Sequence, residues 1–232
     1  MDWLIAWKDD LFYTFEKCFI RDNRYELVFK GIGVTVKIAL LAAILGIIIG
    51  FLIACCNLSK NKFLNAIGKV YTDVIRGTPS VTQLMIIYFV VFASVNIDKW
   101  IIAAIAFSIN SGAYVSEIIR GGILSIDKGQ TEAGRSLGLD GTQTMMNIVV
   151  PQALKNIFPA LGNEFITLIK ETAIVGYVGL VDIQKAGDFI RSSTFEAFMP
   201  LIATAIIYFV LIKLLTVALG IVEKRLRKSD IR

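Results

Sequence analysis

Three ionisable residues lie inside a segment that is otherwise apolar enough to occupy a lipid bilayer. Glu164, Lys170 and Glu171 fall within residues 161–181, where a charge costs at least about 2.5 kcal/mol unless it is paired or hydrated. On a helix, Glu164, Thr167 and Glu171 share one face, and Thr167 also neighbours Lys170. Groups of this kind near the bilayer midplane form binding sites for polar solutes. We therefore expect these four side chains to face protein or water.

Two further polar residues occur in other apolar segments, Gln83 within residues 79–95 and Ser111 within residues 100–119. An amide exposed to lipid would lose its hydrogen bonds, so both residues join the candidate path for a polar solute. An alternative interpretation is that Lys170 pairs with a carboxylate and only holds helices together.

The sequence offers no constellation for covalent chemistry. It contains no histidine, and it lacks both a phosphate-binding G-x-x-x-x-G-K-[ST] loop and a G-x-S-x-G elbow. Cys18, Cys55 and Cys56 show no metal-binding pattern and are interpreted as small apolar residues. We predict no metal site, no enzymatic activity and no ATP hydrolysis by this chain alone.

Composition indicates an all-α protein embedded in a membrane. Hydrophobic residues make up 56% of the 232 residues, and the mean hydropathy is +0.68, whereas soluble domains usually contain about 45–50% apolar residues. Segments of the required length predict five transmembrane helices, with Pro79 in the first turn of the second. Their approximate ranges are 33–56, 79–95, 100–119, 161–181 and 198–222, within a transmembrane domain of residues 31–222.

The flanking segments and the charge distribution predict the orientation. Trp3, Trp7, Leu11, Phe15 and Phe19 recur every four residues, which predicts an amphipathic helix over residues 1–30, either lying in the membrane interface or packed on the bundle. Residues 57–78, 120–160 and 223–232 contain 13 Lys and Arg, against 8 in the alternate segments. The positive-inside rule then places the N-terminus outside and the basic tail, 223–232, in the cytoplasm. Because Lys and Arg lie in short loops beside apolar spans, the net charge of +5 gives no reason to expect nucleic acid.

Residues 125–160 form a polar, glycine-containing segment between two apolar ones. Thr131 to Leu137 are expected to form a short helix that Gly138 ends. Asp140, with Gln143 three residues later, predicts a capping box at the start of the next helix. Pro151 is expected to end or kink that helix.

The same segment resembles the EAA loop of ABC importer permeases. Glu132, Ala133, Gly134 and Gly138, followed by hydrophobic residues and Pro151, match the family pattern E-A-A, three residues, G, nine residues, I-x-L-P, except that Gly134 replaces the second alanine and valines precede the proline. The resemblance extends over residues 31–222 and is closest to permeases for polar amino acids. Its other matching sequences are R-G-T-P from Arg76, S-G-A-Y-V-S-E-I-I-R-G-G-I from Ser111, G-Q-T-E-A from Gly129 and N-E-F-I-T-L-I-K-E-T from Asn163.

The resemblance implies a set of partners. The EAA segment would form a coupling helix that docks on a dimer of cytoplasmic ATPase subunits, which bind ATP and Mg²⁺. An extracytoplasmic binding protein would deliver the substrate, and a second permease subunit, identical or paralogous, would complete the pathway in the cytoplasmic membrane. The expected coupling residues are Gly129, Glu132, Ala133, Gly134, Leu137 and Gly138. An acid at Glu132 would also favour the positive end of the helix dipole.

The expected function is inward transport of a polar amino acid by alternating access. Hydroxyl groups, Gln83 and Lys170 would donate to its carboxylate, while Glu164 or Glu171 would accept from its ammonium group. Our hypothesis is that Glu164 favours a cationic side chain such as that of arginine, lysine or histidine. The alternatives are an importer for glutamine, glutamate or cystine, a secondary transporter driven by an ion gradient, and an enzyme of lipid metabolism.

Overall fold

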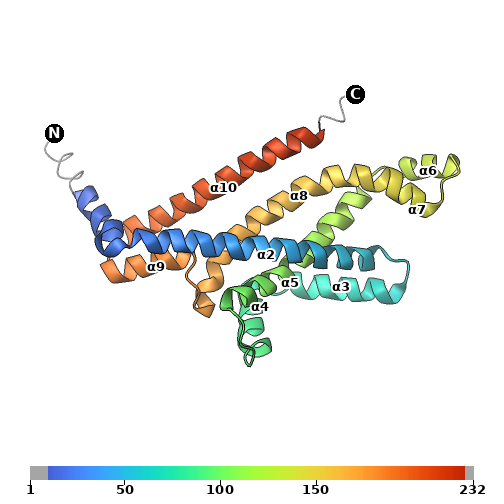
Figure 1. Ribbon diagram of the computed structural model, residues 1–232. Coiled ribbons are helices and arrows are strands. Elements are labelled where there is room, and N and C mark those ends of the chain that lie inside the picture. The colour runs from blue at the N-terminus through green and yellow to red at the C-terminus, as the bar shows by residue number, and fades with distance from the viewer. Residues whose placement is uncertain (1–9, 228–232) are drawn as a thin grey trace.

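The computed structural model describes residues 10–227, and every regular element in that range is helical. Figure 1 shows an elongated bundle with the N-terminal elements at one end and α6 and α7 at the other. The elements, in chain order, are η1 Glu16–Ile20, η2 Arg21–Asn23, α2 Tyr25–Leu58, α3 Lys62–Arg76, α4 Ser80–Ile86, η3 Ile87–Val91, α5 Lys99–Leu124, α6 Lys128–Ser136, α7 Gly141–Thr144, η4 Met145–Val149, α8 Val150–Glu171, η5 Thr172–Val178, α9 Ile183–Thr194 and α10 Phe198–Arg227.

Three helices of the described range, α2, α5 and α10, are long and apolar enough to cross a membrane. A fourth candidate arises if α3 is counted together with α4 and η3, which meet at a bend of 104°. The helix predicted at 33–56 begins earlier, at Tyr25, and the one predicted at 161–181 begins at Val150 and ends at Glu171. Residues 79–95 contain only the short α4 and η3, so they do not form a separate spanning helix.

Close packing of α2 against α5 forms the centre of the bundle. Gly46 lies against Ser111, where an added Cβ would stand 3.1 Å from the serine Cβ, and Gly50 lies against Val115. The absence of side chains at these glycines lets the two backbones approach, as the GxxxG spacing predicts. The largest fully buried side chains around this contact come from α2, α4, α5 and α8, and they are Ile38, Leu84, Phe107, Leu168 and Ile169.

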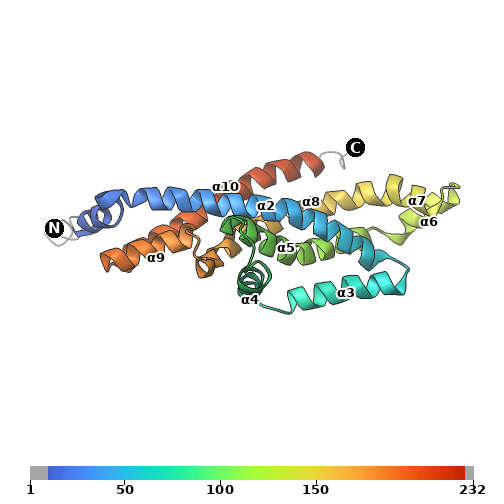
Figure 2. The ribbon, with the colours of Figure 1, turned by 60° about the horizontal axis from the view of Figure 1, so that its bottom comes forward.

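Residues 57–78, a segment with four Lys and Arg between two predicted spans, contain the fifteen-residue helix α3. The Asn61 side chain caps it by accepting from the Phe63 N–H, and the Tyr71 hydroxyl donates to the Ile109 carbonyl of α5 at 2.6 Å. Figure 2 shows α3 turning back beside the end of α2. Pro79 stands just before α4 as its N-cap, one residue earlier than predicted.

The helix that contains Pro151 does not end there, so of the two outcomes predicted for this proline, an end or a kink, the first is wrong. The predicted capping box of Asp140 and Gln143 is present at the start of α7, and α7, η4 and α8 follow one another without a break. The wider π-helical turn η4 comes immediately before α8. Pro151 lies in the first turn of α8, where a missing N–H is tolerated. One continuous helical rod therefore runs from Gly141 to Glu171.

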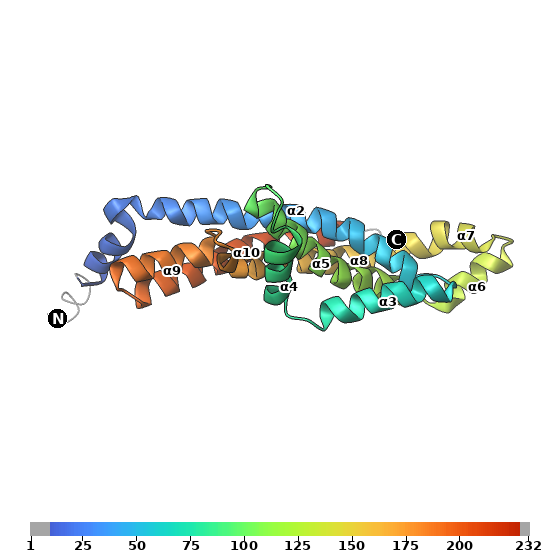
Figure 3. The same ribbon diagram turned by 90° about the horizontal axis from the view of Figure 1, so that it is seen from below.

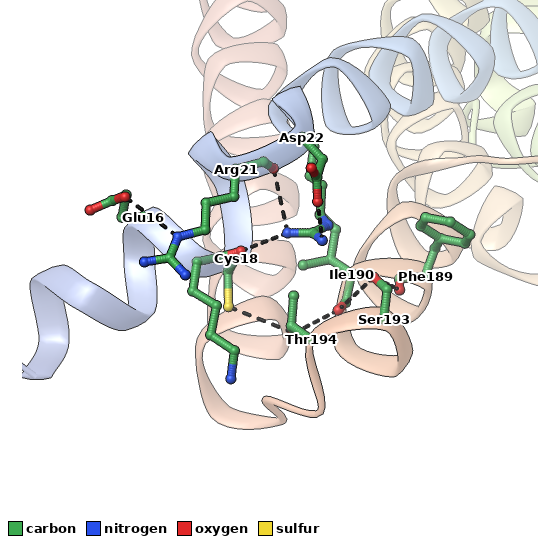
Figure 4. Close-up of polar contacts among 10 residues, drawn as sticks. Glu16, Cys18, Arg21, Asp22, Phe189, Ile190, Ser193 and Thr194 are labelled. Atoms are coloured by element: carbon green, nitrogen blue, oxygen red, sulfur yellow. Dashed lines mark hydrogen bonds and ion pairs between the residues drawn. The ribbon is translucent and has the colours of Figure 1, made fainter.

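The N-terminal segment bends sharply before α2, because Asp22 and Asn23 adopt positive φ angles of 55° and 52°. A single helix over residues 1–30 is therefore not formed. Phe19 is buried against Ile190 of α9, whereas Leu11 and Phe15 are exposed. Figure 4 shows the Cys18 thiol of this segment beside Thr194. Trp3 and Trp7 lie outside the described residues.

Candidate functional site

Glu164 and Ser111, two of the predicted path residues, are in direct contact. The Ser111 hydroxyl on α5 donates to Glu164 Oε1 on α8 at 2.8 Å. Both line a cavity of about 450 Å³, whose walls come from α2, α5, α8 and α10 and are mostly apolar, with Ala43, Phe165, Thr216 and Leu219 among them. Within the described residues no cation forms an ion pair with Glu164. The site thus presents a half-buried carboxylate to an open space.

The other predicted residues of α8 continue from Glu164 toward the end of the helix. Thr167 donates to the Asn163 carbonyl of its own helix at 3.1 Å, Lys170 is exposed and Glu171 is half-buried. The part of the chain that the structure describes contains no ion pair between Lys170 and a carboxylate. The alternative, an ion pair of Lys170 that holds helices together, therefore has no support. The roles of Thr167, Lys170 and Glu171 in a substrate path stay predictions.

Gln83 is hydrogen-bonded within the protein on both sides of its amide. Its Nε2 lies 2.7 Å from the Ile75 carbonyl and 2.6 Å from Thr78 Oγ1, and its Oε1 accepts from Asn110 Nδ2 at 2.9 Å. These contacts join the end of α3 to α4 and α5. Gln83 thereby stabilises the bend between α3 and α4, while a contact with substrate stays a prediction.

The predicted coupling residues lie on α6 and the turn that follows it, at the end of the bundle opposite η1 (Figure 3). Asp127 caps α6, because its carboxylate accepts from the Gly129 N–H at 2.6 Å. Gly138 adopts a positive φ of 84°, which favours glycine and ends the helix, as predicted. Glu132 and Ala133 are exposed, and the Leu137 side chain is 81% exposed.

Gly134 is the buried residue among the predicted coupling residues. A Cβ at this position would lie 2.8 Å from Ile148 Cδ1 and 2.8 Å from Thr144 Cγ2. Since α6 rests on the helical rod at this point, the replacement of the family's alanine by glycine permits the close approach. Gln152 Nε2 adds a hydrogen bond to Gln130 Oε1 at 3.2 Å.

Asp182 is a buried acid that is not among the predicted site residues. It caps α9 by accepting from the Lys185 and Gln184 N–H groups, and the Tyr208 hydroxyl donates to it at 3.1 Å. Burial raises the pKa of its carboxyl, although these three donors act in the opposite direction. The signal in the sequence was an aspartate directly before an amphipathic helical pattern.

Comparison with known proteins defines the class. Residues 46–228 match the family model described as binding-protein-dependent transport system inner membrane component. The chain is 42% identical over 201 residues to a putative glutamine transport system permease protein GlnP of Rickettsia bellii, covering 86% of this chain and 92% of that protein. It is 43% identical over 205 residues to the arginine transport system permease protein ArtQ of Bacillus subtilis, covering 88% and 94%.

A solved structure agrees in fold and sequence. The crystal structure of an amino acid ABC transporter with histidines superposes with a TM-score of 0.82 at 41% identity, covering 89% of this chain and 98% of that one. This chain is thus an inner-membrane permease component of an ABC transporter. It belongs to the binding-protein-dependent transport system inner membrane component family, and the resemblance to permeases of polar amino acid uptake systems is confirmed. Membership excludes the secondary transporter and the lipid enzyme.

Proposed function

We propose that the chain is one of two permease subunits that form the pathway of an ATP-driven importer, with five membrane crossings. Four of the crossings are α2, α5, α8 and α10. The remaining crossing is the bent pair that α3 forms with α4 and η3. Counting α8 is supported by its place in the chain, since it links α6 at one end of the bundle to η5 and α9 farther along. The N-terminus lies outside, and α6 and the basic tail lie in the cytoplasm.

The coupling segment docks on an ATPase dimer. Exposed Glu132 on the short, capped helix α6 and exposed Leu137 directly after it form a protrusion that a cleft of the ATPase can contact. ATP and Mg²⁺ bind to the ATPase subunits, and a binding protein delivers the amino acid from outside. Because α6 packs on the rod at Gly134, movement of the ATPase subunits is passed to the membrane helices.

The substrate is a cationic amino acid of the arginine, lysine or histidine type. The observation that supports this choice is Glu164, a carboxylate that accepts from Ser111 in a cavity and has no ion-pair partner among residues 10–227. Glu171 lies seven residues farther along the same helix and therefore on the same face of it. Two carboxylates in a mostly apolar setting attract positive charge. The relatives named for glutamine and arginine are equally similar, so neutral or acidic amino acids form the alternative.

The test is ATP-dependent uptake of arginine and glutamine into proteoliposomes that contain the permease, its ATPase and its binding protein. A Glu164→Gln protein should lose at least about tenfold of its arginine uptake relative to glutamine, which corresponds to about 1.4 kcal/mol. Asp98→Asn, on the N-cap residue of α5 outside the cavity, serves as the matched control. Unchanged arginine uptake and unchanged discrimination against glutamine in Glu164→Gln would remove the assignment.

A further inference from the structure

A second cavity, separate from the one at Glu164, is lined only by polar and charged side chains. It measures about 340 Å³ and lies between α3, α5 and the end of α2, which is within the size range of sites for small molecules. No residue is shared with the Glu164 cavity. The lining residues are Asn57, Asn65, Lys69, Thr72, Asp73, Arg76, Glu117 and Arg120.

Part of this charge is already paired. Arg120 donates to Glu117 through Nε at 3.0 Å and Nη2 at 2.8 Å, as the i, i+3 spacing favours. Arg76, the first residue of the R-G-T-P sequence, lies 3.9 Å from the same carboxylate and stacks over the Tyr114 ring at 5.4 Å. Glu117 therefore fixes the positions of two guanidinium groups that come from different helices.

Two of the lining residues carry charges that form no ion pair within residues 10–227. Lys69 and Asp73, four residues apart on α3, are both exposed, and neither forms an ion pair within residues 10–227. The cavity therefore offers a free ammonium group and a free carboxylate beside two held guanidinium groups. A simple anion such as phosphate would be attracted by Lys69 and Arg76 but repelled by Asp73. A ligand with both charges can satisfy both residues.

We propose that this cavity binds a zwitterionic α-amino acid, with its carboxylate between Lys69 and Arg76 and its ammonium group at Asp73. The inference rests on the proposed function, because it assigns the site to the same class of substrate. The cavity lies beside the end of α2 and the part of α5 that leads to α6, so in the proposed orientation it opens on the cytoplasmic side. It is a second station, occupied after the substrate leaves the Glu164 cavity.

The experiment measures binding of labelled arginine and labelled glutamine to the purified permease–ATPase complex by equilibrium dialysis, without binding protein. A double variant, Lys69→Gln with Asp73→Asn, removes both free charges and keeps the net charge. Its binding capacity per permease subunit should fall to about half of the wild-type value, because one of the two sites proposed for each subunit is lost. Lys62→Gln, on the same helix outside the cavity, should keep the full capacity.

The outcomes separate the two proposals. Full capacity in the double variant, or no binding to the wild-type complex, overturns the second station even when the wild type imports amino acid. Absence of ATP-dependent uptake by the wild type overturns the proposed function itself. Repeating the dialysis in nanodiscs with anionic lipid tests a lipid headgroup as the alternative occupant of the cavity. If the amino acid binding capacity is lost only in anionic lipid, a lipid headgroup fills the cavity and the proposal is overturned.

Discussion

The two ends of the helical rod from Gly141 to Glu171 are built in different ways. At the α6 end, the contacts are local: Gly134 meets Thr144 and Ile148, and the exposed face of α6 is open to a partner. At the other end, Glu164 meets Ser111 across 53 residues of sequence, inside walls from four helices. A partner protein can bind the capped helix α6 without disturbing the bundle. The carboxylate site at Glu164, in contrast, depends on the whole fold. The rod is the element common to both.

The largest expected effect is at the local end. Gly134→Leu would force a side chain against Ile148 and Thr144 and lift α6 from the rod, at a cost of about 1–3 kcal/mol for overpacking. ATP-dependent uptake should fall up to about 100-fold. Gly141→Leu is the matched control, because nothing lies within 4 Å of a Cβ added there. Equal uptake by the two variants would show that the α6 contact does not carry coupling.

A smaller effect is expected at the distant end. Ser111→Ala removes the donor to Glu164, and a hydrogen bond to a charged group contributes about 1.5–3 kcal/mol. We expect the KM for arginine uptake to change by about tenfold or more. Ser108→Ala is a close control, since Ser108 is equally buried on α5 but donates to the Ile105 carbonyl of its own helix. If both variants shift KM equally, the Ser111 contact has no special role.

The smallest effect tests whether the start of the rod matters for stability alone. Asp140→Ala deletes the side-chain acceptor for the Gln143 N–H at 2.8 Å, which should destabilise the protein by about 1 kcal/mol. The Tm of the purified complex should fall slightly while uptake changes less than in Ser111→Ala. A loss of uptake as large as that of Gly134→Leu would mean that the cap has a direct part in coupling.

Features fixed by neighbouring residues were predictable from sequence. The capping box at Asp140 and the helix stop at Gly138 depend on residues at most four apart, and both are present. Gly46 and Gly50, where α2 packs closely on α5, are four residues apart, a spacing of small residues that lets helices approach. The family followed from the same kind of short, spaced pattern.

Features that depend on tertiary contacts were not predictable. Helix α3 was not predicted, because residues 57–78 are polar in composition. A helical spacing of apolar residues is nevertheless present in that sequence, at Phe63, Ile67, Val70 and Val74. The π-helical turn before Pro151 could not be read from residue types, so an end or a kink of the helix was expected at this proline. Gln83 was recognised as a polar residue that must be satisfied, but its partners at Ile75, Thr78 and Asn110 depend on the bend.

We propose that the helical rod joins the predicted coupling residues on α6 to the carboxylate site as one rigid body. Spin labels at Gln143→Cys and Thr167→Cys, in a protein whose three native cysteines are replaced, would be separated by about 36 Å along a helix. Electron–electron resonance on the complex, with and without ATP, measures that separation. We expect the distance to stay constant while a label pair between the two permease subunits changes. A change in this distance would show that the rod is not rigid and would place a hinge between its ends, where Pro159 interrupts the backbone hydrogen bonds.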